Sequence, residues 1–381
     1  MSDQASTDRH WMLHALRLAE AGWGRVHPNP MVGAVVVKDG VVVGEGYHAE
    51  YGGPHAEVAA LEAAGPAAAG ATLYVTLEPC RHWGKTPPCT NAVIRAGVTR
   101  VVVAALDPSP DAGGGAAMLR EAAIEVATGV CADEAKRQNA AFFHAQKSML
   151  PFVTLKLAAS LDGCISGAPG VRTTISGPES LQRVHILRAG YDAVLIGANT
   201  ARVDNPLLTV RGPIEPIRPP IRVVLDSNLS VSPESELVKT AGEAPLWLLA
   251  RGDVPIERRW RLEQKGVRVI AVPAGVGGLD IRAALAALHA RGVRSIFCEG
   301  GARVVASLLA VDAVERLHLF VAPLVLGGGV RAFEHEVMPI GFEVSMTETI
   351  GRDVHIQLER RRVKAPREPE ETRALDVHRT G

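Results

Sequence analysis

A histidine, a glutamate and two cysteines have the residue types and order of a metal centre that performs hydrolysis. His55 and Glu57 are separated by one residue, and Cys80 follows a proline, with eight residues between it and Cys89. A catalytic zinc ion takes three protein ligands and leaves a fourth position for water, so one imidazole and two thiolates suffice. Bound zinc makes that water nucleophilic near neutral pH, and a nearby carboxylate can carry its protons. We predict that His55, Cys80 and Cys89 bind zinc and that Glu57 is catalytic.

The order of these residues narrows the reaction to deamination of a nucleobase. His-x-Glu, followed later by Pro-Cys and a second cysteine, is the signature of zinc deaminases. Each element alone is weak, because His-x-Glu arises by chance and a buried cysteine is usually a small hydrophobe. The tripeptide His-Ala-Glu occurs at 48–50 and at 55–57, but only the second copy begins a predicted helix that a strand then links to Cys80. One departure is segment 81–88, which replaces the two residues usual between the cysteines.

Length and composition indicate a globular enzyme of two domains. The chain has 381 residues, more than one ordinary core accommodates. Hydrophobic residues make up 47% and charged residues 22%, which fits neither a disordered chain nor a membrane protein. Lys plus Arg equals Asp plus Glu at 41 each, so the composition gives no general attraction to nucleic acid or to membranes. The polar N-terminus and the five scattered cysteines favour a cytoplasmic enzyme over a secreted, disulfide-bonded one.

The elements that position the zinc ligands alternate between helices and strands. An amphipathic helix is predicted at 9–21, and a hairpin at 32–47 turns at Asp39-Gly40, a dipeptide that strongly favours a two-residue turn. Further helices are expected at 55–64, 88–96 and 116–123, and strands at 72–76, 99–105 and 124–128. The result is an α/β sandwich of about five strands, in which His55 begins one helix and Cys89 lies at the start of another.

A second α/β domain begins near Pro151, where a helical segment ends and a new strand starts. Strands are predicted at 152–157, 193–197, 221–226, 246–250, 267–272, 295–299 and 316–321, and helices at 179–189, 256–265, 281–291 and 302–309. We therefore place the domains at 1–149 and 150–362. Residues 363–381 are rich in Arg, Glu and Pro without periodicity and are expected to form a disordered tail. Gly113-Gly114-Gly115 is expected to be a plain flexible loop.

The segment around the cysteines carries a specific resemblance. Leu77-Glu78-Pro79-Cys80-Arg81-His82-Trp83-Gly84-Lys85-Thr86-Pro87-Pro88-Cys89, with Asn29-Pro30-Met31-Val32-Gly33 upstream, resembles the bifunctional riboflavin-biosynthesis pyrimidine deaminase/reductase family. The resemblance covers nearly the whole chain. It implies an N-terminal cytidine-deaminase-like three-layer α/β/α sandwich and a C-terminal dihydrofolate-reductase-like α/β domain. It also implies contacts with the pyrimidine or its phosphate from Asn29, His48, His82, Lys85 and Thr86.

The resemblance implies two reactions and two cofactors. The first domain, with one Zn²⁺ per chain, would hydrolytically deaminate 2,5-diamino-6-ribosylamino-4(3H)-pyrimidinone 5′-phosphate, and the second would reduce the ribosyl group to ribityl with NADPH. Motifs similar to those of the reductase occur at 156–163, 187–189, 204–206, 208–211, 226–227 and 299–301. They imply catalytic roles for Lys156 and Asp204, and substrate binding by Arg188, Leu207, Arg211 and Glu299. They imply cofactor binding by Ala158, Thr174, Ser176, Thr200, Ser227, Gly300 and Gly301.

The residue types suit these roles. Arginine guanidinium groups at 188 and 211 can grip a sugar phosphate bidentately. Lys156 or Asp204 can polarise the open-chain ribose or transfer its proton. The glycines at 300–301 lie where a strand leads into a helix, so their amides can approach a pyrophosphate closely, and the glycines at 327–329 would help in the same way.

The chain departs from the family pattern at three positions in the second domain. Thr174 stands where the family commonly has a tryptophan, Arg172 where it often has a small hydroxyl residue, and Cys164 where a basic residue is usual. These departures leave a second hypothesis open, in which the reductase-like half is a binding or dimerisation module. A third hypothesis is a nucleic-acid deaminase related by fold alone, which the neutral net charge disfavours. For the favoured bifunctional enzyme we expect a small-molecule substrate, a homo-oligomer (dimer or tetramer), and no nucleic-acid or membrane partner.

Overall fold

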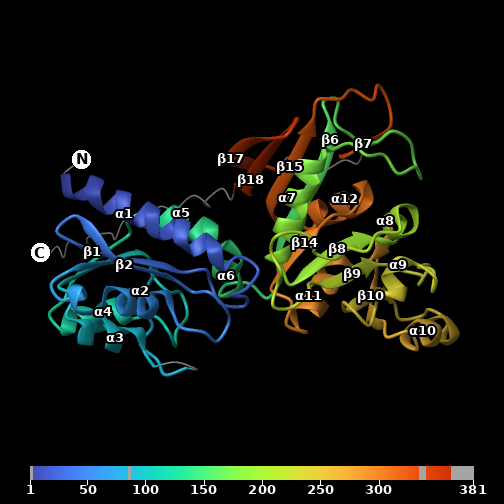
Figure 1. Ribbon diagram of the computed structural model, residues 1–381. Coiled ribbons are helices and arrows are strands. Elements are labelled where there is room, and N and C mark those ends of the chain that lie inside the picture. Colours follow the sequence, from blue (N-terminus) through green and yellow to red (C-terminus); the bar gives the residue numbers. More distant parts are fainter. Residues whose placement is uncertain (1–2, 85–86, 334–339, 362–381) are drawn as a thin grey trace, which may run out of the picture.

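The computed structural model contains two large β-sheets, one in each half of the chain, and helices cover both faces of each of them (Figure 1). It describes residues 3–84, 87–333 and 340–361. Within these residues, no helix is long and apolar enough to cross a membrane. The tail predicted at 363–381 lies outside the described residues.

The N-terminal sheet has five strands in the order β2-β1-β3-β4-β5. Strand β1 pairs antiparallel with β2 and β3, whereas β3, β4 and β5 are parallel. Its strands are β1 (Gly33–Lys38), β2 (Val41–Tyr47), β3 (Thr72–Leu77), β4 (Arg100–Ala105) and β5 (Glu125–Thr128). The helices of this half are α1 (Asp3–Ala19), α2 (Ala56–Ala64), α3 (Cys89–Ala96), α4 (Gly115–Glu121), α5 (Ala132–Gln138) and α6 (Ala140–Ala145), with short 3-10 turns at Glu20–Gly22 and Gly65–Ala68.

Two apolar clusters make this half a three-layer sandwich. One face of the sheet packs against α2, α3 and α4, with Ala60, Val93 and Leu119 fully buried. The other face packs against α1 and α5, with Met12 and Ala135 buried. The expected α/β/α architecture is confirmed.

Local sequence signals explain the element boundaries. Asp39 (φ 51°) and Gly40 (φ 77°) both occupy the left-handed region, as a tight two-residue hairpin turn requires. Gly97 ends α3 in the same left-handed conformation, which glycine adopts at little cost. Helix α1 begins at Asp3, earlier than predicted. Its first turns are polar, so the pattern of apolar residues does not reveal them.

The C-terminal sheet has nine strands in the order β11-β10-β9-β8-β14-β6-β15-β18-β17. The strands from β11 to β15 are parallel, and the hairpin β17–β18 adds two antiparallel strands at one edge. Its strands are β6 (Phe152–Ser160), β8 (Ala193–Gly197), β9 (Ile221–Leu225), β10 (Leu246–Arg251), β11 (Arg268–Val272), β14 (Ser295–Cys298), β15 (Val314–Ala322), β17 (Phe342–Ile350) and β18 (Asp353–Arg360). Four short strands form two separate ribbons: β7 (Cys164–Ser166) with β16 (Val330–Arg331), and β12 (Ala274–Gly275) with β13 (Gly278–Leu279).

Helices cover both faces of this sheet as well. They are α7 (Pro178–Ala189), α8 (Ala198–Asp204), α9 (Glu236–Lys239), α10 (Ile256–Glu263), α11 (Ile281–His289) and α12 (Ala302–Ala310). Helices α11 and α12 pack on one face, and α7, α9 and α10 contribute to the clusters on the other. The second α/β domain is thereby confirmed in outline.

Several elements were not predicted. Helices α5, α8 and α9 are short, with seven, seven and four residues, and therefore carry little periodic signal. The hairpin β17–β18 was also not predicted, and β17 is half-exposed at a sheet edge. The glycine run 113–115 is not a plain flexible loop: a Cβ on Gly115 would lie 1.8 Å from the Pro79 carbonyl oxygen, and Gly114 has φ +94°. Close packing against the segment just before Cys80 requires these glycines.

Candidate active sites

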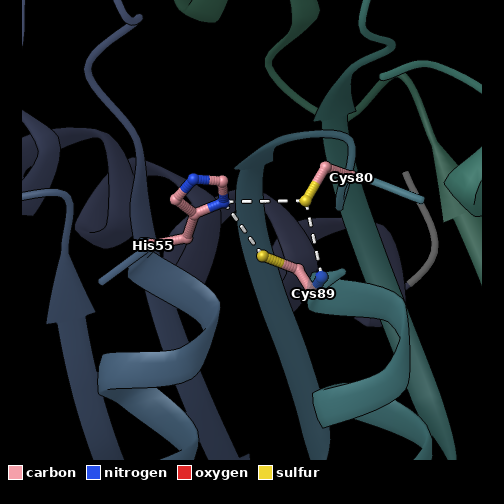
Figure 2. Close-up of side chains that lie close together, drawn as sticks. All are labelled: His55, Cys80 and Cys89. Atoms are coloured by element: carbon pink, nitrogen blue, oxygen red, sulfur yellow. Dashed lines mark hydrogen bonds between the residues drawn. The ribbon is translucent and has the colours of Figure 1, made fainter. Parts of the chain in front are cut away.

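The predicted zinc ligands meet in one cluster, shown in Figure 2, at the start of two helices. His55 is the N-terminal flanking residue of α2, Cys80 follows β3, and Cys89 is the first residue of α3. The His55 Nδ1 atom lies 3.1 Å from Cys89 Sγ and 3.7 Å from Cys80 Sγ. The ligand atoms all lie within 4.8 Å of one another.

The donor set fits a zinc ion. Around a tetrahedral zinc with bonds of about 2.0 to 2.3 Å, neighbouring ligand atoms lie roughly 3.3 to 3.8 Å apart, close to the separations here. Imidazole and thiolate are ligands that zinc favours. The Cys89 thiol and the Cys89 amide both donate toward Cys80, which lowers the pKa of Cys80 to about 4. The contact with Cys80, together with burial, raises the pKa of Cys89.

Glu57 lies beside this cluster without belonging to it. It is in the first turn of α2 and is only 4% exposed. Burial raises the pKa of its carboxyl group, and the neighbouring His55 opposes that effect. A buried carboxyl group next to a metal site, and not among its ligands, is placed to take up and release protons.

The cluster opens into a cavity of about 340 Å³. Asn29 and His48, both predicted to bind substrate, lie in its wall, and Asn29 Nδ2 is 3.2 Å from His48 Nε2. His48 Nδ1 is 3.0 Å from the Pro54 carbonyl oxygen, which can only accept, so Nδ1 carries the proton and Nε2 accepts from Asn29. The structure therefore brings Asn29 and His48 together with the zinc cluster.

The loop between the cysteines is described only in part. His82 lines the cavity and has an exposed side chain. Lys85 and Thr86, the other two predicted contacts in this loop, lie outside the described residues. The sequence analysis did not identify Glu78, whose buried carboxylate accepts hydrogen bonds from the amides of Asp107, Gly114 and Ala116.

Glu78 thereby fixes the loop that forms the far side of the cavity. Asp107, Ser109 and Ala112 of this loop line the cavity, as do Tyr51 and Phe142. Glu78 could have been noticed because it directly precedes Pro79-Cys80. Single charged residues in loops are common, however, so its position alone predicts no role.

A second group of charged side chains meets in the C-terminal half. The Arg188 guanidinium group and the Glu299 carboxylate pair through two hydrogen bonds, Nε to Oε1 at 2.5 Å and Nη2 to Oε2 at 3.0 Å. Burial lowers the pKa of Lys156, which is half-buried, while Glu299 and Asp204 raise it and Arg188 lowers it further. Burial raises the pKa of Asp204, and Arg172 and Lys156 oppose that rise. Lys156, Asp204, Arg188 and Glu299 are thus electrostatic neighbours.

The pairing of Arg188 bears on phosphate recognition. The two Arg188 nitrogens that could bind a phosphate bidentately, Nε and Nη2, already donate to Glu299. The third, Nη1, donates to the Thr209 carbonyl oxygen at 3.0 Å. Arg211 has an exposed side chain, and its backbone amide donates to His185 Nδ1. Arg211 is therefore the better placed of the two arginines to meet a phosphate from solution.

The predicted substrate residue Leu207 is held by a buried arginine. Arg222, which is fully buried, donates from Nη1 to the Leu207 carbonyl oxygen at 3.2 Å and to Thr240 Oγ1 at 2.6 Å. The sequence analysis did not single out Arg222, because an arginine in a strand gives no indication of its partners.

Three of the residues predicted to bind cofactor, Thr200, Gly300 and Gly301, lie just after the ends of β8 and β14. Gly301 is the N-terminal flanking residue of α12, and a Cβ on it would lie 3.5 Å from Thr200 Oγ1. The hydroxyl of Ser176 is buried without a hydrogen-bond partner among the described residues. A helix N-terminus that follows a central parallel strand, as Gly301 does after β14, fits the phosphates of a dinucleotide.

Other predicted cofactor residues are more dispersed. Ala158 lies on β6 two residues after Lys156, and Ser227 follows β9. Thr174 is exposed. The glycine run at 327–329 is already engaged, because the Gly327 amide donates to Asp162 Oδ2 at 2.9 Å.

Two family models match this chain. Residues 151–356 match the RibD C-terminal domain, and residues 5–105 match the cytidine and deoxycytidylate deaminase zinc-binding region. The first match covers more than half of the chain, and the second includes His55, Cys80 and Cys89.

Curated and solved relatives are similar over nearly the full length. The riboflavin biosynthesis protein RibD of Aquifex aeolicus is 42% identical over 359 residues, which cover 93% of this chain and 98% of that protein. RibD of Escherichia coli is 40% identical, over 85% of this chain and 90% of that protein. The structure of Acinetobacter baumannii RibD superposes with a TM-score of 0.82 at 33% identity, over 94% of this chain and 100% of that one. The diaminohydroxyphosphoribosylaminopyrimidine deaminase/5-amino-6-(5-phosphoribosylamino)uracil reductase of Thermotoga maritima gives 0.80 at 33% identity, over 94% and 99%.

Proposed function

Because this chain belongs to the RibD family of bifunctional riboflavin-biosynthesis enzymes, we propose which of its residues carry each of its two reactions. The chain is a zinc-dependent deaminase in its N-terminal half and an NADPH-dependent reductase in its C-terminal half. We propose 2,5-diamino-6-ribosylamino-4(3H)-pyrimidinone 5′-phosphate as the first substrate, in line with the name of the Thermotoga protein. The observation that carries the proposal is the meeting of His55, Cys80 and Cys89 beside buried Glu57 in one cavity.

In the deaminase site, the chain supplies ligands, orientation and proton transfer. His55, Cys80 and Cys89 would hold the zinc ion, which supplies an acidified water molecule as the nucleophile. Hydrolysis replaces the exocyclic amine with a carbonyl oxygen and releases ammonia, so both protons of the water must be transferred, one to the leaving amine and one to a ring nitrogen. Glu57 performs both transfers, and Asn29 with His48 orients the pyrimidine.

In the reductase site, NADPH supplies the electrons, and the chain supplies charge and protons. Opening of the ribose ring places a proton on the ring oxygen before the ribityl chain forms. Lys156 would transfer this proton at Nζ, because burial lowers its pKa and the nearby Glu299 and Asp204 oppose that fall. Arg188 holds Glu299 in place, Arg211 and Leu207 contact the sugar phosphate, and the remaining residues of the set bind the cofactor: Ala158, Thr174, Ser176, Thr200, Ser227, Gly300 and Gly301.

The organisation of the chain completes the proposal. We place the deaminase at 1–149 and the reductase at 150–362, because the first sheet ends with β5 and the second begins with β6 at Phe152. We propose a homo-oligomer, a dimer or a tetramer, because the edge strand β17 exposes Val344. The thiol ligands and the use of NADPH favour a reducing, cytoplasmic location. Light scattering measures the oligomeric state directly.

Release of ammonia tests the proposed function. The purified protein should release one ammonia for each pyrimidine substrate consumed, without NADPH, and Glu57→Gln should release it far more slowly. Ammonia release by Glu57→Gln at the wild-type rate would contradict the assignment of the site.

A further inference from the structure

The segment that leads to Asn29 is anchored in the other half of the chain. Trp23 lies in the N-terminal half, yet its indole Nε1 donates to the Ile186 carbonyl oxygen on α7 at 2.7 Å. The ring also packs edge-on to Tyr191, with centroids 6.1 Å apart. Trp23 is therefore part of the apolar cluster beneath α7.

The Trp23 ring packs directly against the backbone of Gly190. A Cβ at position 190 would lie 2.1 Å from Trp23 Cζ2 and 2.2 Å from Cε2, too close for any side chain. The backbone of Gly190 has φ −91° and ψ 8°, which ordinary residues adopt. The turn itself does not demand glycine there, whereas the approach of the indole does.

A second contact secures the same segment four residues later. His27 Nδ1 lies 2.8 Å from Asp192 Oδ1, two residues after Gly190. Asp192 is itself fixed, because its Oδ2 accepts from the amides of Arg294 and Ser295 at 2.7 and 2.9 Å. Gly24 also packs against this turn, since a Cβ there would lie 3.1 Å from Ala189. The turn between α7 and β8 thus holds the segment at both ends.

Asn29 directly follows this anchored segment and enters the deaminase cavity. Its amide group donates to His48, and both residues lie in the cavity wall. On the other side, the backbone of Met31 is fixed by two hydrogen bonds with the Asn139 side chain, each 2.8 Å. Asn29 is held between the reductase half before it and Asn139 after it.

We propose that Trp23, packed against Gly190, is a positioning residue that holds Asn29 in place for pyrimidine binding. The affinity of the deaminase cavity then depends on a contact with the reductase half. The inference rests on the proposed deaminase function. A displaced Asn29 weakens binding of substrate and transition state alike, so it raises KM and leaves kcat nearly unchanged.

Gly190→Ala is the sharpest test, because it adds one methyl group where only Trp23 demands its absence. Deamination by Gly190→Ala should show KM raised about tenfold, with kcat within about twofold of wild type. Trp23→Ala should also raise KM, and it removes the clash. The double variant Gly190→Ala/Trp23→Ala should therefore have the KM of Trp23→Ala, because the two changes act through one contact. His27→Ala should raise KM by a smaller factor.

Further readouts separate positioning from loss of structure. Zinc content should be unchanged in every variant, and amide hydrogen exchange in segment 23–31 should rise in Gly190→Ala. Trp260→Ala, a change at a tryptophan that is 60% exposed on α10, is the matched control and should behave as wild type.

Three outcomes would overturn the inference. Gly190→Ala could have the wild-type KM, or it could lower kcat without raising KM. The third is a KM of the double variant raised by the product of the two single fold-increases. An inactive wild-type protein would instead refute the proposed function. Failure of the inference and failure of the function are therefore distinguishable.

Discussion

The Arg188 guanidinium group faces the Glu299 carboxylate through two parallel hydrogen bonds, with the side chains only 11% and 12% exposed. A bidentate pair in such a setting has a fixed geometry. Because of this fixed geometry, the Glu299 carboxylate stays next to Lys156, where its negative charge raises the pKa of the lysine. The reductase site is therefore organised around a carboxylate that one arginine holds in place.

Removal of that carboxylate should shift the pH profile of reduction. Glu299 raises the pKa of Lys156, whereas Arg188 lowers it. Glu299→Gln removes the carboxylate that raises this pKa and leaves the positive charge of Arg188 without its partner. The pKa of Lys156 should therefore fall. If the protonated Lys156 is required, the alkaline limb of reductase activity moves to lower pH. An unmoved limb in steady-state assays across pH would mean that Lys156 is not the acid.

Loss of one zinc ligand should remove the metal. The wild-type protein should contain about one zinc per chain, and Cys89→Ala should lose most of it, because two ligands do not hold zinc against solvent. Elemental analysis by mass spectrometry measures this directly. Cys131→Ala is the control, since Cys131 is a buried cysteine outside the cluster. Full occupancy in Cys89→Ala would refute the ligand assignment.

Glu57→Gln should separate chemistry from binding. The amide keeps the shape of the side chain but cannot shuttle protons, so kcat for deamination should fall about a hundredfold or more. Zinc content should stay at the wild-type value. A variant with near wild-type kcat would show that another group carries the protons.

The sequence predicted that His55, Cys80 and Cys89 lie together, because local signals place all three residues. His55 precedes a helix, Cys80 follows a strand and Cys89 begins the next helix, so three element boundaries define the site. The contact of Trp23 with Gly190 was not predicted, because it joins residues far apart in the chain and neither has a chemical signature. Glu78 and Arg222 were not predicted because most of their hydrogen-bond partners are backbone groups, which leave no pattern in the sequence.

Changes in the reductase site should leave deamination intact. Lys156→Ala and Asp204→Asn should each abolish reduction, while deamination stays within about twofold of wild type, because the two sites have separate cores and no shared side chain. Both activities are measured on the same preparation, so unfolding is visible as a joint loss. Equal loss of the two activities would contradict the division of labour between the halves.

The most direct test of the bifunctional account is mass spectrometry of the pyrimidine substrate incubated with the wild-type enzyme, with and without NADPH. Without NADPH, the account predicts a product with the exocyclic amine replaced by oxygen and the ribosyl group intact. With NADPH, the deaminated product should gain two hydrogen atoms as the ribosyl group becomes ribityl. A product that stops at deamination with NADPH present, or an unchanged substrate, would contradict the account.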